Sequence, residues 1–363
     1  MKSIDKEDYN DGYYHLSKDV EDYPDAIIYI IWSRRGPGKT YSALRYPYHK
    51  FRTIYMKRTN KDVKTILTED PMLNRSKSPW MPLNRDFGCC VKGVVLDDGI
   101  GAFYDSDADG NPVGEVINDV LSLNAIKTIK GMDLTDAEWM IFDEFIPLPG
   151  EVVKRDEGEM LLNVYETASR DRVKRGRKHL KLILMSNADE ISTHITNELE
   201  VVDTIAEMQA KGIHRYYDEK RRILFHHISN EECPRSDDEK SGMELVMAGT
   251  AYAAKAYEGQ FASNDFTNIQ ELSLKRMRCL YHIHYRRKND AYIYLHPEKG
   301  LYYMTDIKGP YIESFNLDRE NQQKKFYYDH VLDLREACID DRMRFRKYSY
   351  YDLIINYSKF YDL

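Results

Sequence analysis

The sequence predicts an α/β fold built on a mostly parallel sheet, and three observations indicate it. Residues 26–32 form an apolar run, AIIYIIW, that ends in a turn rich in Arg, Gly and Pro. Residues 139–142, WMIF, and the largely apolar residues 180–185, LKLILM, each lead directly into polar residues. Apolar runs bounded by turn signals are typical of strands that are buried on both faces of a parallel sheet.

Length and charge limit the classes of protein. A chain of 363 residues is long enough for two or three domains with a sizeable core. The net charge is −7, so the molecule is not a polycation, and nucleic-acid contacts would have to come from local patches. The N-terminus is polar and acidic, and no stretch approaches 18 uninterrupted apolar residues, so we expect neither secretion nor membrane spanning. Five scattered cysteines indicate reduced thiols in a cytoplasm.

The segment after the first apolar run, SRRGPGKT at residues 33–40, reads as a phosphate-binding loop. Glycines let backbone N–H groups surround a phosphate, Lys39 would reach the β/γ oxygens, and the Thr40 hydroxyl would ligate Mg²⁺. A helix starting there would add its positive N-terminus. The usual pattern begins with Gly, where this chain has Ser33, and an ordinary strand-to-helix turn is the alternative.

A short helix over 41–46 and a strand over 53–56 follow the loop. That strand leads into Lys57 and Arg58, at the sheet edge where ligands bind in open α/β folds, so these residues are candidates for phosphate or nucleic-acid contacts. A solvated loop is the competing interpretation. The β runs at 91–96 and 100–104 indicate a β insertion or a sheet edge.

An acidic pair, Asp143 and Glu144, follows the apolar run at 139–142. At the tip of a buried strand, Asp143 would hold the Mg²⁺ that Thr40 also contacts, and Glu144 would polarise the attacking water. The phosphate loop and this strand together predict a nucleoside-triphosphate hydrolase that uses Mg²⁺.

A helix predicted over 156–170 ends in a basic run that begins at Arg170 and includes Arg172. An arginine there would be able to reach the γ-phosphate of a neighbouring subunit, although such runs are usually solvated surface. Asn187, at the tip of the strand over 180–185, is a candidate for sensing the γ-phosphate or orienting water; a simple turn residue is the alternative.

The chain beyond residue 187 changes in kind. We predict a helix over 194–212, a strand over 222–228, a polar stretch over 229–242 and a small helical linker over 243–261. The part from residue 271 onward carries a net charge of +3, whereas the part before it carries −10, and it holds 14 of the 29 tyrosines.

The tail reads as three antiparallel strands over 279–285, 291–296 and 301–305, followed by helices over 327–338 and 350–360. This order suits a ribonuclease-H-like domain, but the first strand, CLYHIHYRR, lacks the acid that such a nuclease needs. We therefore expect a nuclease-dead binding domain. Its candidates for nucleic-acid or portal contacts are basic residues among many tyrosines, namely Arg286, Arg287 and Lys288. A merely solvated fold is the alternative, and His282 and His284 lack a third metal ligand nearby.

Several of these segments resemble the DNA-packaging ATPases of small tailed bacteriophages, the encapsidation proteins of phi-twenty-nine-like podophages. The matching segments, in the family's order, are SRRGPGKTYSALRYP, IFDEFI, SRDR with its basic run, MSNA and, more weakly, GQFASND at 259–265. The resemblance implies an additional-strand P-loop ATPase. It also implies site roles for Lys39, Thr40, Asp143, Glu144, Arg170 in trans, Asn187 and the loop residues Arg35, Gly36, Pro37 and Gly38.

The resemblance further implies a homomeric ring, pentameric in the family, that drives double-stranded DNA into an empty capsid. Its partners would be the capsid portal and possibly an RNA adaptor, in the host cytoplasm at the procapsid vertex. We expect an ATPase domain over 1–230, a linker or lid over 231–270 and the C-terminal domain over 271–363. The alternatives are another P-loop nucleic-acid motor, such as a helicase or conjugation-type pump, and a non-enzymatic nucleotide-gated assembly module.

Overall fold

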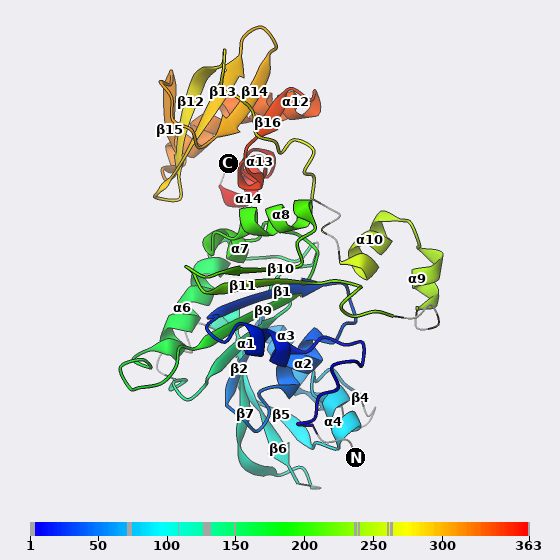
Figure 1. The fold of residues 1–363 in the computed structure, drawn as a ribbon. Helices are drawn as coiled ribbons and strands as arrows, with labels where there is room; N and C mark the ends of the chain where they lie inside the picture. Colours follow the sequence, from blue (N-terminus) through cyan, green and yellow to red (C-terminus); the bar gives the residue numbers. More distant parts are fainter. Residues whose placement is uncertain are drawn as a thin grey trace. The chain divides into compact units, whose positions relative to one another are not determined.

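The computed structural model forms two compact units (Figure 1). The first comprises Met1–Glu198 and Lys211–Ser263, and the second comprises Leu199–Ala210 and Asn264–Leu363. Residues 199–210 therefore join the C-terminal unit, and most of the predicted linker joins the first unit, unlike the expected boundaries at 230 and 270. The structure describes residues 4–70, 75–107, 109–125, 132–148, 150–235, 238, 240–259, 261 and 264–361.

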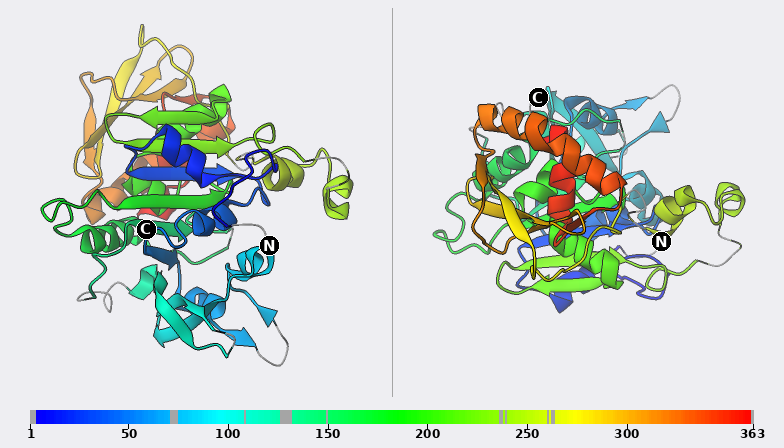
Figure 2. Two further views of the ribbon diagram at one scale, coloured as in Figure 1. Left: turned by 60° about the horizontal axis from the view of Figure 1, so that its bottom comes forward. Right: turned by 90° about the horizontal axis from the view of Figure 1, so that it is seen from above.

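A nine-stranded sheet forms the first unit, in the order β10-β11-β1-β9-β8-β2-β7-β6-β5. The six strands from β11 to β7 are parallel, and β10, β6 and β5 add antiparallel edges, which lie at opposite ends of the sheet in Figure 2. The predicted α/β class with a mostly parallel sheet is thus confirmed. The strands are β1 (Ile28–Ser33), β2 (Thr53–Lys57), β5 (Val91–Asp97), β6 (Ile100–Ser106), β7 (Pro112–Ser122), β8 (Trp139–Asp143), β9 (Lys181–Asn187), β10 (Arg215–Asp218) and β11 (Ile223–Ile228).

Helices cover this sheet because alternate residues of each strand point to opposite faces. Tyr29 and Ile31 of β1 join one buried core with the helices that lie in front of the strands in Figure 1. No helix among the described ranges is long and apolar enough to cross a membrane. The described helices of this unit are α1 (Leu16–Asp22), α2 (Lys39–Arg45), α3 (Asn60–Leu67), α4 (Met81–Phe87), α6 (Glu157–Ser169), α7 (His194–Glu198), α9 (Gly242–Val246) and α10 (Ala251–Glu258). The short strands β3 (Glu69–Asp70) and β4 (Arg75–Ser76) pair with each other, and η1 (Leu123–Ala125) is a short 3₁₀ helix.

The single helix predicted over 194–212 is wrong. The chain forms α7 and then α8 (Val202–Lys211), because Glu200 adopts a left-handed conformation with φ 52° that ends the first helix. In the second unit, Asp203 of α8 accepts hydrogen bonds of 2.8 Å from the backbone N–H and the hydroxyl of Ser349. This carboxylate therefore satisfies a free N–H in the first turn of α13 (Tyr348–Ile355).

The second unit is a five-stranded sheet in the order β15-β12-β13-β14-β16, with a core shared with its helices. The three predicted antiparallel strands are present, and β15 pairs in parallel with β12. The ribonuclease-H-like assignment stays a prediction. The elements are β12 (Arg278–Tyr285), β13 (Asn289–His296), β14 (Leu301–Thr305), β15 (Glu313–Asn316), β16 (Met343–Phe345), α11 (Glu320–Phe326), η3 (Tyr327–Val331), α12 (Leu332–Ile339), α13 and α14 (Tyr357–Phe360).

A buried charge cluster ties the N-terminal helix to strand β11. His226 is fully buried and contacts the Asp19 carboxylate at 2.7 Å and the Glu232 carboxylate at 2.8 Å, while Tyr14 donates to Asp19 at 2.8 Å. Burial by itself lowers the pKa of His226, but the two carboxylates outweigh it and raise the pKa above its ordinary value. The protonated imidazolium is therefore the form that stabilises the fold.

This cluster predicts a pH-dependent stability. Because the folded-state pKa of His226 is raised, its contribution is fully present below the unfolded pKa of about 6.5 and is lost as the pH rises through the folded value. Urea denaturation across this range should show the wild type losing stability with rising pH relative to His226→Gln, in which that titration is absent. Parallel pH profiles for the two proteins would contradict the assignment.

Candidate active site

The predicted phosphate loop connects β1 to α2 and requires glycine at two positions. Gly36 and Gly38 have φ values of 96° and 85°, which L-residues with side chains rarely adopt. A Cβ at Gly38 would also lie 3.3 Å from the ring of Tyr13. The segment that follows β11 fixes the loop, because Arg34 donates to Asn230 Oδ1 at 2.7 Å and to the Cys233 carbonyl at 2.8 Å.

The weaker family segment at 259–265 lies partly in the described structure. A Cβ at Gly259 would lie 2.5 Å from the backbone N of Arg34, and Ala256 accepts a 3.1 Å hydrogen bond from the N–H of Arg35. The end of the predicted linker therefore packs against the phosphate loop within the first unit. Gln260, Ala262 and Ser263 lie outside the described residues.

Lys39 is buried at the start of α2, and its ammonium group is coordinated by neutral oxygens. Nζ donates to Ser33 Oγ at 2.6 Å and to Asn187 Oδ1 at 3.3 Å. Burial lowers the pKa of Lys39 to about 8, against the opposing pull of Asp143. An ammonium group in this environment favours an anionic ligand. Ser33, which replaces the usual Gly, thus has a contact of its own, because its hydroxyl accepts from Lys39 and donates to the Arg34 carbonyl.

Asp143, at the end of β8, accepts hydrogen bonds from three side chains of two neighbouring segments, the start of α2 and strand β2. Thr40 Oγ1 lies 3.2 Å from each carboxylate oxygen, Tyr55 donates its hydroxyl at 2.7 Å, and Lys57 Nζ lies at 3.2 Å. These groups meet because the carboxyl ends of parallel strands share one edge of the sheet. Tyr55 is fully buried, so its hydroxyl fixes the orientation of the carboxylate.

Glu144 projects from the same tip in a strained backbone conformation. Its φ is 60°, a rare value for a non-glycine residue that is typical of functional sites. Its side chain is 66% exposed, and its carboxylate accepts a 2.9 Å hydrogen bond from Lys57 Nζ. Burial alone lowers the pKa of Lys57, but Asp143 and Glu144 outweigh it and raise the pKa, so this ammonium group stays charged.

Lys57 and Arg58 therefore differ from the expected nucleic-acid contacts. Both side chains are buried among active-site groups instead of lying on a solvated loop. Arg58 donates to the backbone carbonyls of Glu144 and Phe145, at 3.1 and 2.8 Å, and pairs with the buried Glu157 carboxylate. The correction has a physical cause, because Lys57 pairs with the carboxylates at the tip of β8, whereas Arg58 binds the backbone carbonyls that follow this tip and the Glu157 carboxylate.

The residues present fit a magnesium–triphosphate group. Thr40 and Asp143 supply adjacent hard oxygen ligands, which Mg²⁺ prefers, and Lys39 supplies a buried cation beside a loop of unhindered glycines. No group of three or more His, Cys, Asp or Glu within the described ranges is arranged to hold a metal. Mg²⁺ usually binds through one or two carboxylates together with substrate phosphates.

The predicted basic run lies at the opposite end of β8 from the acidic pair. Arg170 is exposed at the end of α6, whereas Arg172 is buried. Arg172 donates to the carbonyl of Ala137, to that of Thr135 at 2.8 Å and to that of Lys178 at 3.1 Å. Arg172 is therefore engaged within its own chain, and the trans role of Arg170 stays a prediction.

The basic residues of the tail are partly engaged. The guanidinium of Arg286 lies 5.2 Å from the ring centre of Phe360, and Lys288 pairs with Glu200 at 2.9 Å. Arg287 is exposed on the turn between β12 and β13. His282 and His284 both contact the Asp290 carboxylate, at 2.8 and 2.9 Å. Nucleic-acid binding by these residues stays a prediction.

Sequence reasoning missed Tyr55 and the active-site position of Lys57. Tyr55 is one of several aromatic residues in apolar strands, and no local pattern distinguishes it from a core residue. For Lys57, the signal was its place at the end of a parallel strand, which was consistent with both a phosphate contact and a DNA contact.

The buried Arg172 predicts a measurable stability effect. Arg172→Met should lower the free energy of unfolding by about 1–3 kcal/mol, because buried carbonyl acceptors would lose their donors. Urea denaturation measures this change. Lys174→Met is the matched control, since that side chain is 86% exposed and its replacement should have little effect. Equal stability of the two variants would contradict the anchoring role of Arg172.

Comparisons with known proteins support the fold. No family model matches the sequence, and no curated protein matches it. Among solved structures, a chain of the bacteriophage Phi-29 viral genome packaging motor assembly superposes with a TM-score of 0.62 at 16% identity, over 96% of this chain and 99% of that chain. A chain of the Phi-28 gp11 DNA packaging motor gives a TM-score of 0.56 at 17% identity, over 96% of each chain. The protein therefore has the fold of these motor chains over nearly its whole length.

Proposed function

We propose that this protein is an ATP-hydrolysing motor that translocates double-stranded DNA into a preformed viral capsid. The observation that carries the proposal is the convergence of Lys39, Thr40, Asp143, Glu144 and Asn187 at one sheet edge. Hydrolysis of a nucleoside triphosphate requires this set: a phosphate-binding loop, a metal ligand pair and a base. The likeness to the Phi-29 and Phi-28 motor chains supports packaging as the use of that hydrolysis.

The residues divide the chemistry as follows. The loop from Arg35 to Thr40 binds the phosphates, and Lys39 neutralises the β/γ oxygens. When bound, Mg²⁺ supplies charge neutralisation at these phosphates, and Thr40 and Asp143 are the residues that would hold it. Glu144 orients and deprotonates the attacking water. Asn187 senses the γ-phosphate, a role that its 3.3 Å hydrogen bond with Lys39 supports.

Lys57 holds the carboxylate of Glu144 through an ion pair. Its ammonium group lies 3.2 Å from Asp143 and 2.9 Å from Glu144. Glu144 is released to contact the attacking water when Lys57 turns toward the phosphates. Hydrolysis is thereby tied to correct occupation of the loop.

The motor acts as a homomeric ring at the portal vertex of the procapsid, in the host cytoplasm. Arg170 ends α6 two residues before Arg172, which is bonded to residues that precede β8, whereas Glu144 follows this strand; within a ring, Arg170 would serve the site of a neighbouring subunit. The second unit has no nuclease activity and binds DNA or the portal through Arg286, Arg287 and Lys288. A pentameric ring and an RNA adaptor are part of this proposal by family resemblance.

The first test replaces the base. Glu144→Gln should retain ATP binding but lower phosphate release by about 10²- to 10⁴-fold, the usual worth of a positioned base. Glu219→Gln, an exposed residue beyond β10, is the matched control and should hydrolyse normally. Duplex DNA should stimulate the wild type, and DNA should become nuclease-resistant only when empty capsids are added. Near-normal turnover by the Gln variant would remove Glu144 from the mechanism, and capsid-independent translocation would favour another kind of motor.

The second test concerns the arginine supplied in trans. Arg170→Ala should bind ATP and hydrolyse poorly, since an arginine that stabilises the transition state is worth roughly 10³–10⁵ in rate. Mixing it with Glu144→Gln should restore part of the activity, because the Gln subunit offers its arginine to a neighbour with an intact base. Lys174→Ala is the control for general loss of charge in the basic run. Failure of rescue in mixed rings confirmed by native mass spectrometry would contradict the trans role.

A further inference from the structure

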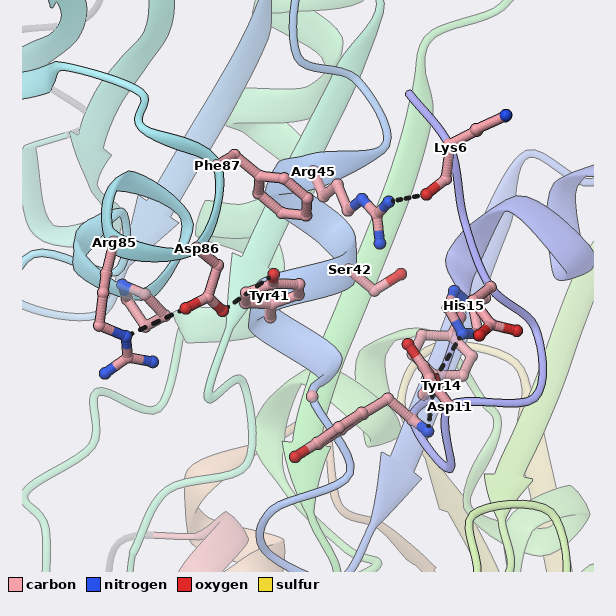
Figure 3. Close-up of a pocket in the computed structure, with 14 residues that line it drawn as sticks. Lys6, Asp11, Tyr14, His15, Tyr41, Ser42, Arg45, Arg85, Asp86 and Phe87 are labelled. Atoms are coloured by element: carbon pink, nitrogen blue, oxygen red, sulfur yellow. Dashed lines mark hydrogen bonds and ion pairs between the residues drawn. The ribbon is translucent and has the colours of Figure 1, made fainter. Parts of the chain in front are cut away.

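The N-terminal segment forms the first of two anchors that hold the phosphate loop. The N–H of Tyr14 donates to the Pro37 carbonyl at 2.9 Å. Two residues later, the N–H of Leu16 donates to Ser42 Oγ of α2 at 2.7 Å. Figure 3 shows Tyr14 and Ser42 at a cavity that both residues line together with Gly38. The middle of the loop is thereby tied to the residues that precede and begin α1.

The turn that follows β11 forms the second anchor. Arg34, at the start of the loop, donates to Asn230 and to the carbonyl of Cys233. The turn is closed by the N–H of Cys233, which donates to the Ser229 carbonyl at 3.2 Å. Glu232 lies between the two acceptors of Arg34 in the sequence. The start of the loop is therefore positioned by the same turn that carries Glu232.

Both anchors meet at one fully buried histidine, His226. Its Nδ1 lies 2.7 Å from Asp19 Oδ2, which also accepts the hydroxyl of Tyr14 at 2.8 Å. Its Nε2 lies 2.8 Å from Glu232 Oε2. One imidazole ring thus joins the N-terminal anchor to the anchor that follows β11.

Two carboxylates on one imidazole require an N–H on each ring nitrogen. Ionised carboxylates only accept hydrogen bonds, and a neutral imidazole has a single N–H. When His226 loses its proton, one of the two contacts therefore becomes a repulsion between two acceptors. Burial lowers the pKa of His226, but Asp19 and Glu232 outweigh it and raise the pKa above its ordinary value. The bridging form is thus the imidazolium.

The remaining charges around His226 make its proton important. Arg215 of β10 lies 3.3 Å from Asp19 Oδ1 and 2.9 Å from Glu232 Oε1. Its Nε lies 3.3 Å from His226 Nε2, and its guanidinium also pairs with Asp22 at 3.5 Å. Two cations therefore face three carboxylates. Loss of the histidine proton leaves Arg215 to compensate all three.

We propose that His226 is a positioning residue for the phosphate loop, and that loss of its proton releases one anchor and weakens nucleotide binding. The inference rests on the proposed function and adds to it a pH-dependent regulation of the same site. A loop that is released from an anchor samples more conformations, so it loses more conformational entropy when its N–H groups close around the phosphates. The ligand class is a nucleoside diphosphate or triphosphate.

The test measures the dissociation constant for ADP with Mg²⁺ by isothermal titration calorimetry of the full-length chain between about pH 6 and 9. At the acidic end, His226→Gln should bind ADP about 2- to 10-fold more weakly than the wild type, the net effect of one hydrogen bond. An amide, like the neutral imidazole, has donors on one nitrogen only. The ratio of the two constants should therefore approach one as the pH rises through the folded pKa of His226. Lys39, whose pKa burial lowers to about 8, titrates in both proteins, so its effect cancels in this ratio.

Glu232→Ala is a second variant, because this side chain is 31% exposed and its loss should be tolerated by the fold. It should also bind ADP about 2- to 10-fold more weakly at the acidic end. Asp22→Ala is the matched control, since it removes a 58% exposed carboxylate that pairs with Arg215 instead of His226. Its affinity for ADP should match that of the wild type.

The outcomes separate this inference from the proposed function. If His226→Gln and Glu232→Ala both bind ADP as the wild type does at every pH, the positioning role is overturned while the proposed function stands. If His226→Gln does not fold, the affinity of Glu232→Ala decides in the same way. If the wild type does not bind ADP, the proposed function itself fails.

Discussion

The carboxylate of Asp143 is the group on which the organisation of the site depends. It accepts hydrogen bonds from Thr40 after β1 and from Tyr55 and Lys57 of β2, so it joins the ends of three strands of one sheet. Only a parallel arrangement brings these ends to a common edge. The order of the strands in the sheet therefore determines which side chains lie close enough to form one site.

Two buried lysines at this edge of the sheet have pKa values that are shifted in opposite directions. Lys39 lies among neutral oxygens and has a lowered pKa, whereas Lys57 lies between two carboxylates and has a raised pKa. A buried ammonium group among neutral oxygens favours an anionic ligand. Lys57 already has its compensating charges in Asp143 and Glu144.

The far end of β8 serves a different purpose. Arg172 closes the loop that follows α6 onto the residues that precede this strand, and so holds the exposed Arg170 on a fixed element. Fixing an exposed side chain in advance reduces the conformational entropy that it would lose on binding a partner. Arg170 is exposed and Arg172 is buried, although the two lie only two residues apart.

The sequence by itself determined the local features: the buried strands, the glycine loop, the acidic tip of β8 and the helix that ends at the basic run. Each depends on residues close together in the chain, where periodicity and turn chemistry act. Only the tertiary structure decided that Lys57 and Arg58 are buried in the site, that α8 joins the C-terminal unit, and that the N-terminal segment lines a cavity beside Gly38. These facts depend on strand order and long-range packing, which a local pattern does not encode.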